Sequence, residues 1–200
     1  SYSFNEIFSF DDEILEMIPK PVHSVIFLFP VGESSGPLET RYTENSTPEK
    51  NDSNLPWFTL QSLPNACGTI AVIHSILNNL DHVRVVPETW LAKFIEKSKT
   101  MTPAERGNYI ESNNEIQEIH EDNAVEDTTP IVEEDAMNHF IAFIIKDGKC
   151  WELDGRKPRP ICHGPTKDLL ATAIKIIQTD FLPHVDNPLR VSAVAFTGNV

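Results

Sequence analysis

One cysteine of the chain lies where its thiol can act as a nucleophile. Cys67 stands near the start of an apolar stretch over residues 66–77, which favours a buried helix. At a helix N-terminus, the helix dipole and the free backbone N–H groups stabilise a thiolate and lower the cysteine pKa. The same N–H groups can hold an oxyanion when the thiolate attacks a carbonyl carbon. A lone buried cysteine is more often a small hydrophobic side chain, so catalysis also requires a base.

A hairpin further along the chain can supply that base. Residues 140–146 and 149–154 read as strands joined by a two-residue Asp-Gly turn. In this register His139 falls opposite Arg156, and Asp154 lies on the same face, two residues from that partner. A diagonal pair of this kind is within reach of a planar side chain. A slip of one residue would place the two side chains on opposite faces.

These side chains can together form a catalytic triad with an oxyanion donor. Asp154 can orient His139 and stabilise its imidazolium, while His139 takes the proton of Cys67. The alternatives are a strand-end histidine bonded to solvent and an aspartate that shapes the turn after the strand. Gln61, six residues before Cys67, can donate its side-chain amide to an oxyanion. Its alternative is an ordinary polar loop residue.

The composition argues against several kinds of partner and site. Thirty acidic and 16 basic residues give a net charge of −14. This charge argues against a nucleic-acid partner, because phosphate binding needs clustered Lys and Arg. No apolar run approaches the roughly 20 residues of a membrane-spanning helix. Three cysteines without a Cys-x-x-Cys pattern predict no metal and no cofactor, and they favour reduced thiols in the cytoplasm, with the nucleus as an alternative.

Strands and helices mix along the chain without regular alternation, which predicts an α+β fold. We expect an antiparallel sheet flanked by helices, in one domain of 200 residues. Surface loops are expected at 32–56 and, as an acidic segment without Lys or Arg, at 121–135. The predicted helices are 13–18, 66–77, one from Pro87 onward, one from near Thr102, 115–119 and 166–180, and the predicted strands are 22–30, 140–146, 149–154 and 190–196.

Four short blocks of sequence occur in an order that is typical of one protein family. They are Gln61, Asn65-Ala-Cys-Gly-Thr69, Asn138-His139 and Trp151-Glu-Leu-Asp-Gly155. Two further stretches are also similar to this family, Ile18-Pro-Lys-Pro21 and the following Val25-Ile-Phe-Leu-Phe-Pro30. On these features the chain resembles ubiquitin carboxyl-terminal hydrolases of the UCH type. The resemblance covers nearly the whole chain and is closer to the compact members than to those with a long C-terminal extension.

The resemblance implies a papain-like UCH fold, an antiparallel sheet flanked by helices, with a knotted backbone. It implies that residues 1–200 form a single catalytic domain and that 120–137 form an acidic crossover loop over the active-site cleft. By position, the catalytic residues would be the nucleophile Cys67, the general acid–base His139, its orienter Asp154 and the oxyanion donor Gln61. The implied substrate-binding residues are Asn65, Asn138, Glu133, Glu134 and Asp135.

The implied activity is hydrolysis of an amide, ester or thioester at the C-terminal glycine of ubiquitin, with a small or unstructured leaving group. Ubiquitin would be the protein partner, its basic C-terminal tail suiting the acidic loop, and the enzyme is expected to be a monomer. A solvated acidic loop is the alternative. Two other functions remain open: a ubiquitin-binding module without turnover, and a thiol hydrolase for a ubiquitin-like modifier. Family members usually carry a further segment ahead of the position of Ser1, so a truncated N-terminus is expected.

Overall fold

The computed structural model describes residues 2–31, 55–113, 116, 137–185 and 187–198. The predicted helix at 115–119 (all but residue 116), residues 120–136 of the expected crossover loop and nearly all of the loop at 32–56 lie outside these ranges. The predicted substrate-binding residues Glu133, Glu134 and Asp135 lie outside them as well. Within the described ranges, no helix combines the length and the apolar character that crossing a membrane requires.

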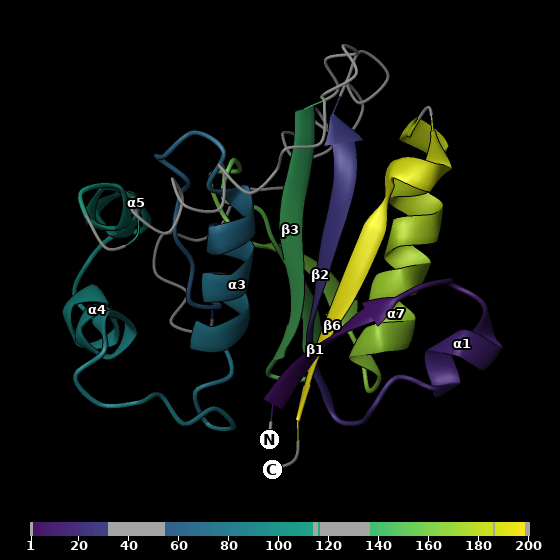
Figure 1. Ribbon diagram of the computed structural model, residues 1–200, viewed down its shortest axis with the longest axis horizontal. Helices are drawn as coiled ribbons and strands as arrows, with labels where there is room; N and C mark the ends of the chain where they lie inside the picture. The colour runs from purple at the N-terminus through teal and green to yellow at the C-terminus, as the bar shows by residue number, and fades with distance from the viewer. Residues whose placement is uncertain (1, 32–54, 114–115, 117–136, 186, 199–200) are drawn as a thin grey trace, which may run out of the picture.

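A six-stranded antiparallel sheet forms the centre of the protein (Figure 1). Neighbouring strands are antiparallel throughout, and their order is β1-β6-β2-β3-β4-β5. The strands are β1 (Tyr2–Ile7), β2 (Val22–Val31), β3 (Met137–Lys146), β4 (Lys149–Leu153), β5 (Ile161–Pro165) and β6 (Ser192–Gly198). The predicted antiparallel sheet is confirmed. The two edge strands β1 and β5 are not among the predicted strands, because edges tolerate polar residues, Gly and Pro that weaken the sequence pattern.

Helices cover both faces of the sheet (Figure 1). On one face lies α3, with α4 and α5 beyond it, and on the other lies α7, with α1 beside it. The helices are α1 (Asp12–Glu16), α3 (Cys67–Leu77), α4 (Trp90–Ser98), α5 (Pro103–Glu111) and α7 (Leu169–Ile176), followed by the π-helical turn η2 (Ile177–Phe181) and the 3₁₀ turns η3 (Leu182–His184) and η4 (Pro188–Arg190). This arrangement confirms the predicted α+β class.

Polar caps make some elements begin later than predicted. The Asp168 carboxylate accepts a hydrogen bond from the Ala171 N–H, so α7 begins after that cap. The Thr89 hydroxyl caps α4 in the same way, and Pro87 therefore lies outside the helix. The last strand also begins late, because η4 takes up the residues directly before Val191.

Alternate residues of the central strands face two different hydrophobic cores. Phe27 and Phe143 belong to the core on the α7 side, whereas Ile26 and Ile144 belong to the core on the α3 side. Complete burial of each phenylalanine contributes roughly 1.5–3 kcal/mol through its removal from water. A third cluster joins α3 to α4 and α5. Helix α3 is therefore held on two sides, which places its N-terminus firmly against β3.

The β3–β4 hairpin has the predicted register. Lys146 pairs with Lys149, and the Asp-Gly turn between them has φ angles of 52° and 69°. Two successive left-handed residues are what a type I′ turn requires, and Gly adopts this conformation without steric cost. The register brings His139 and Asp154 to the same face at the open end of the hairpin.

Candidate active site

Three side chains from distant parts of the chain meet at the N-terminus of α3. Cys67 is the first residue of α3, His139 lies near the start of β3, and Asp154 directly follows β4. His139 Nε2 lies 2.7 Å from Asp154 Oδ1, and each of these side chains is 3% exposed. Cys67 is 7% exposed, and its thiol interacts with the His139 ring and with the backbone of Phe140. The structure thus brings together the three residues that the sequence singled out.

The hydrogen bond to Asp154 decides which nitrogen of His139 can act as a base. A carboxylate only accepts hydrogen bonds, so Nε2 carries a hydrogen and Nδ1 holds the free lone pair of the neutral ring. Nδ1 is buried, and the ring interacts with the Cys67 thiol. Such contacts are often long before substrate binds. Nδ1 is therefore the atom positioned to receive the thiol proton.

The pKa values of the thiol and the imidazole move toward each other. Burial raises the pKa of Cys67, but hydrogen bonds with His139 and the Phe140 backbone, and the charges of His139 and Arg156, lower it overall. Burial lowers the pKa of His139, but its hydrogen bonds with Asp154 and Cys67 together raise it overall. Burial raises the pKa of Asp154, but the hydrogen bond with His139 and its charge, together with the Arg156 N–H and the charge of Lys157, lower it overall. These shifts favour a thiolate–imidazolium pair beside an ionised carboxylate.

The chain around Asp154 is closely packed. Asp154 Oδ1 also accepts the Arg156 N–H at 2.9 Å. The next residue, Gly155, has no room for a side chain, because a Cβ there would lie 2.9 Å from Ile70 Cγ2 and 3.1 Å from Gln61 Cβ. The end of β4 therefore lies directly against α3 and against the segment that carries Gln61.

Gln61 reaches the same site through its backbone. The Gln61 N–H donates to the Gly155 carbonyl at 2.8 Å. Its side-chain Nε2 donates to the Leu63 carbonyl at 3.1 Å, which leaves the second amide hydrogen for another acceptor. This position, close to the end of β4 and to the first turns of α3, is compatible with an oxyanion donor, and the role stays a prediction.

The two predicted substrate-binding asparagines lie at the surface beside the site. Asn65 is exposed two residues before Cys67, and its φ of 59° is left-handed. Asn138 is exposed next to His139, opposite Pro30 of β2. Both are accessible to a partner, and their binding role stays a prediction.

Two contributors to the site were not predicted as such. Arg156 was expected only as the cross-strand neighbour of His139, yet its charge lowers the pKa of Cys67. The Phe140 backbone also lowers this pKa. Both effects depend on how α3 packs against the hairpin, so no local signal in the sequence indicates them. In the described part of the chain, no cluster of three or more His, Cys, Asp or Glu residues could hold a metal ion.

Comparisons with known proteins identify the relatives of this chain. The family model Peptidase_C12, described as ubiquitin carboxyl-terminal hydrolase, family 1, matches residues 1–181. The chain is 37% identical over 176 residues to ubiquitin carboxyl-terminal hydrolase 3 of Arabidopsis thaliana, covering 87% of this chain and 74% of that protein. It is 35% identical over 204 residues to the ubiquitin carboxyl-terminal hydrolase of Drosophila melanogaster, covering 98% and 87% of the two chains.

A solved structure has the same fold. The Trichinella spiralis UCH37 catalytic domain bound to ubiquitin vinyl methyl ester matches with a TM-score of 0.76 at 23% identity, covering 99% of this chain and 86% of that one. The expected UCH fold is thereby confirmed, whereas the knotted backbone stays a prediction. The family match over most of the chain, together with these relatives, shows that the protein belongs to family 1 of the ubiquitin carboxyl-terminal hydrolases.

Proposed function

We propose that this protein is a thiol-dependent deubiquitinase, which hydrolyses amide, ester or thioester bonds at the C-terminal glycine of ubiquitin. The observation that carries the proposal is the buried arrangement of Cys67, His139 and Asp154 at the N-terminus of α3. Membership of the family supports the choice of ubiquitin, since the relatives are named ubiquitin carboxyl-terminal hydrolases and the UCH37 domain was solved with a ubiquitin ester.

The reaction begins when the Cys67 proton passes to His139 Nδ1. The thiolate attacks the glycine carbonyl carbon, and the C=O electron pair moves onto oxygen to form a tetrahedral oxyanion. When this intermediate collapses, the bond to the leaving group breaks and His139 returns the proton to that group. The glycine is then held as a thioester on Sγ. Water then gives one proton to His139 and attacks the thioester carbon. The C–S bond breaks, His139 returns the proton to the Cys67 sulfur, and the carboxylic acid of ubiquitin loses its remaining proton to solvent.

Two groups stabilise the oxyanion in this proposal. The backbone N–H of Cys67 belongs to the first turn of α3, where N–H groups have no acceptor within the helix. The second is the free amide hydrogen of Gln61. Donors fixed in a buried site stabilise charge that appears only in the transition state, and loss of one typically lowers kcat by about 10²–10³-fold. Asp154 keeps the His139 ring in the required tautomer and stabilises its imidazolium form.

The partner and the setting of the reaction are also proposals. The net charge of −14 complements the basic tail of ubiquitin, and complementary charge speeds association. An acidic crossover loop at 120–137 would limit the leaving group to small or unstructured chains. We expect a monomeric enzyme in the cytoplasm, with the nucleus as an alternative. Light scattering and imaging of the tagged protein would test these two expectations.

Hydrolysis of a fluorogenic ubiquitin C-terminal amide tests the proposal directly. We expect turnover by the wild type and by Cys162→Ala, whose thiol is exposed on β5, and none by Cys67→Ala. Full turnover by Cys67→Ala would overturn the assignment of the nucleophile. A wild type that binds ubiquitin without turnover would be a binding module, and one that cleaves only a ubiquitin-like amide would serve another modifier.

A further inference from the structure

The histidine of α3, His74, contacts the segment at residues 57–61, which carries Gln61. His74 lies seven residues after Cys67, about two helical turns, so the two side chains lie on the same side of α3. His74 is fully buried, and its ring stacks on Phe58 with a centroid separation of 5.0 Å and an interplanar angle of 9°. The proposed mechanism gives this histidine no role.

His74 accepts a hydrogen bond from the backbone of that segment. The Thr59 N–H donates to His74 Nε2 at 3.1 Å, so Nε2 is unprotonated and Nδ1 carries the ring hydrogen. Burial lowers the pKa of His74 to about 4, which keeps the ring a neutral acceptor at neutral pH. Thr59 is itself fully buried, so without this acceptor its N–H would be cut off from water and unsatisfied.

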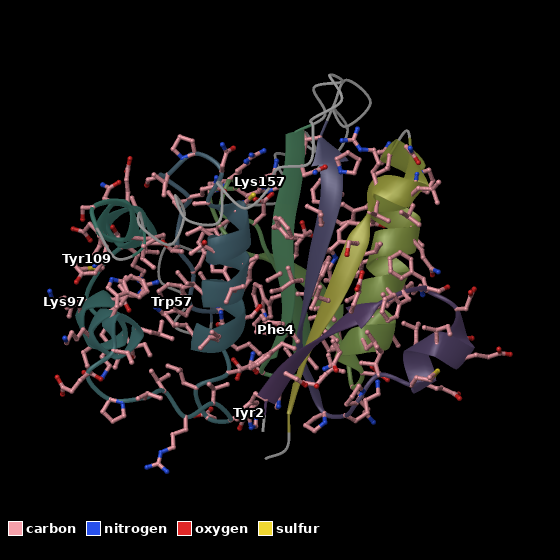
Figure 2. All side chains as sticks on the ribbon, in the orientation of Figure 1. Tyr2, Phe4, Trp57, Lys97, Tyr109 and Lys157 are labelled. Atoms are coloured by element: carbon pink, nitrogen blue, oxygen red, sulfur yellow. The ribbon has the colours of Figure 1, made fainter. Side chains whose placement is uncertain are left out.

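Two further side chains hold the residues before Thr59. The Asn78 side chain hydrogen-bonds both backbone groups of Trp57. Its Oδ1 accepts the Trp57 N–H at 2.8 Å, and its Nδ2 donates to the Trp57 carbonyl at 2.9 Å. Arg106 on α5 donates to the Phe58 carbonyl at 2.7 Å and lies 4.8 Å from the centre of the Trp57 ring. Figure 2 shows Trp57 on the side of α3 that faces α4 and α5. This segment, residues 57–61, is therefore held between α3 and α5 and is called the clamped segment.

The clamped segment runs antiparallel to α3. Trp57 is held by Asn78 at the C-terminal end of the helix, and Thr59 is held by His74 one turn nearer the N-terminus. Gln61 then lies beside the Asp-Gly pair at the end of β4, close to the active-site end of α3. One helix thus carries the nucleophile and also holds the chain two residues before the proposed oxyanion donor.

We infer that His74 is a positioning residue for the oxyanion site: by accepting the Thr59 N–H, it fixes the separation between the Gln61 amide and the Cys67 backbone N–H. The inference rests on the proposed function, because it concerns the same reaction. Fixed donors lower the barrier only when they point at the position of the oxyanion, and a displacement of about 1 Å can cost roughly 10²-fold in rate.

Kinetics of the ubiquitin amide with His74→Leu and His74→Gln test this inference. We expect His74→Leu to lower kcat by about 10- to 100-fold with little change in KM, because the oxyanion is stabilised only in the transition state. The amide oxygen introduced by His74→Gln can accept the Thr59 N–H, so this variant should recover most of the loss. Alkylation of Cys67 by iodoacetamide should be unchanged in both variants, since His139 and Asp154 are not altered.

A double-mutant cycle separates positioning from a general loss of stability. In a Gln61→Ala background, His74→Leu should cost little further activity, because the group that it positions is already gone. His23→Leu is the matched control, since His23 is also buried and bonds the Gly198 carbonyl at 3.1 Å at the start of β2. We expect this control to retain the wild-type kcat at a temperature below its unfolding transition.

Several results would overturn the inference. The first two are a wild-type kcat in His74→Leu, and a fold-loss of kcat from His74→Leu that is as large in the Gln61→Ala background as in the wild type. The others are a loss of kcat in His23→Leu equal to that in His74→Leu, and a kcat in His74→Gln no higher than in His74→Leu. If His74→Leu does not fold, the same measurements are made on His74→Asn, because the asparagine side chain is too short for its amide to reach the Thr59 N–H. A wild type without turnover would overturn the proposed function and this inference together, whereas an active wild type with the same kcat in His74→Leu would overturn the inference alone.

Discussion

Replacing Asp154 with Asn removes one charge from the active site and preserves the shape of the side chain. Asp154 Oδ1 accepts hydrogen bonds from His139 Nε2 at 2.7 Å and from the Arg156 N–H at 2.9 Å. An amide oxygen can still accept these bonds, but it cannot balance the charge of an imidazolium. Because Asp154 and His139 are each 3% exposed, water cannot replace the lost charge.

The expected size of the effect follows from the loss of a charge-assisted hydrogen bond, which is worth about 1.5–3 kcal/mol. Since about 1.4 kcal/mol corresponds to tenfold in rate, kcat/KM should fall by roughly 10- to 100-fold. The pH profile should change as well. Asp154 raises the pKa of His139, and His139 lowers the pKa of Cys67. Without the carboxylate, the pKa of His139 falls, so the imidazolium is lost at lower pH and the pH range of the ion pair narrows from its alkaline side.

The assay is kcat/KM for the ubiquitin amide across the pH range, for the wild type and Asp154→Asn. The alkaline limb, which reports loss of the imidazolium proton, should move to lower pH in the variant. Asp168→Asn is the control, because this exposed carboxylate caps α7 and should leave the profile unchanged. An Asp154→Asn enzyme with wild-type kcat/KM and an unchanged or broader profile would refute the reasoning.

Two further substitutions test other parts of the site. Gln61→Ala should lower kcat by about 10²-fold in steady-state assays while KM changes little, and an unchanged kcat would exclude Gln61 as oxyanion donor. Gly155→Ala should destabilise the fold by about 1–3 kcal/mol in urea unfolding, because its Cβ would meet Ile70 and Gln61 at 2.9 and 3.1 Å. Gly68→Ala is the matched control, since its Cβ would meet the Phe140 ring at an ordinary 3.6 Å, and an equal loss in both variants would contradict the steric argument.

Local patterns in the sequence predict the elements that carry the proposed catalytic residues. The Asp-Gly turn allows the two left-handed residues of a type I′ turn, and this alone sets the register that puts His139 and Asp154 on one face. The apolar run after Ala66 predicts α3 with Cys67 in its first turn. These features depend on residues close together in the chain, so a single sequence is enough to predict them.

Other features are visible only in the tertiary structure. The edge strand β5 ends in Gly164 and Pro165, which argue against a strand when the chain is read locally. The approach of Cys67 to His139 requires α3 to lie against β3, and the shared burial of side chains between them holds it there. Gln61 can lie against the end of β4 because residue 155 is a glycine, which has no side chain to separate the two segments.

The sequence by itself therefore determines the hairpin, the helix that carries Cys67 and the four residue types of the proposed site, since turn conformation and helix formation are decided within a few residues. Only the tertiary structure decides the strand order, the contact between Cys67 and His139, and the part of His74 in holding Thr59. The physical reason is that these contacts join segments far apart in the chain, and they form only when the burial of common cores outweighs the entropy of closing the loops between those segments.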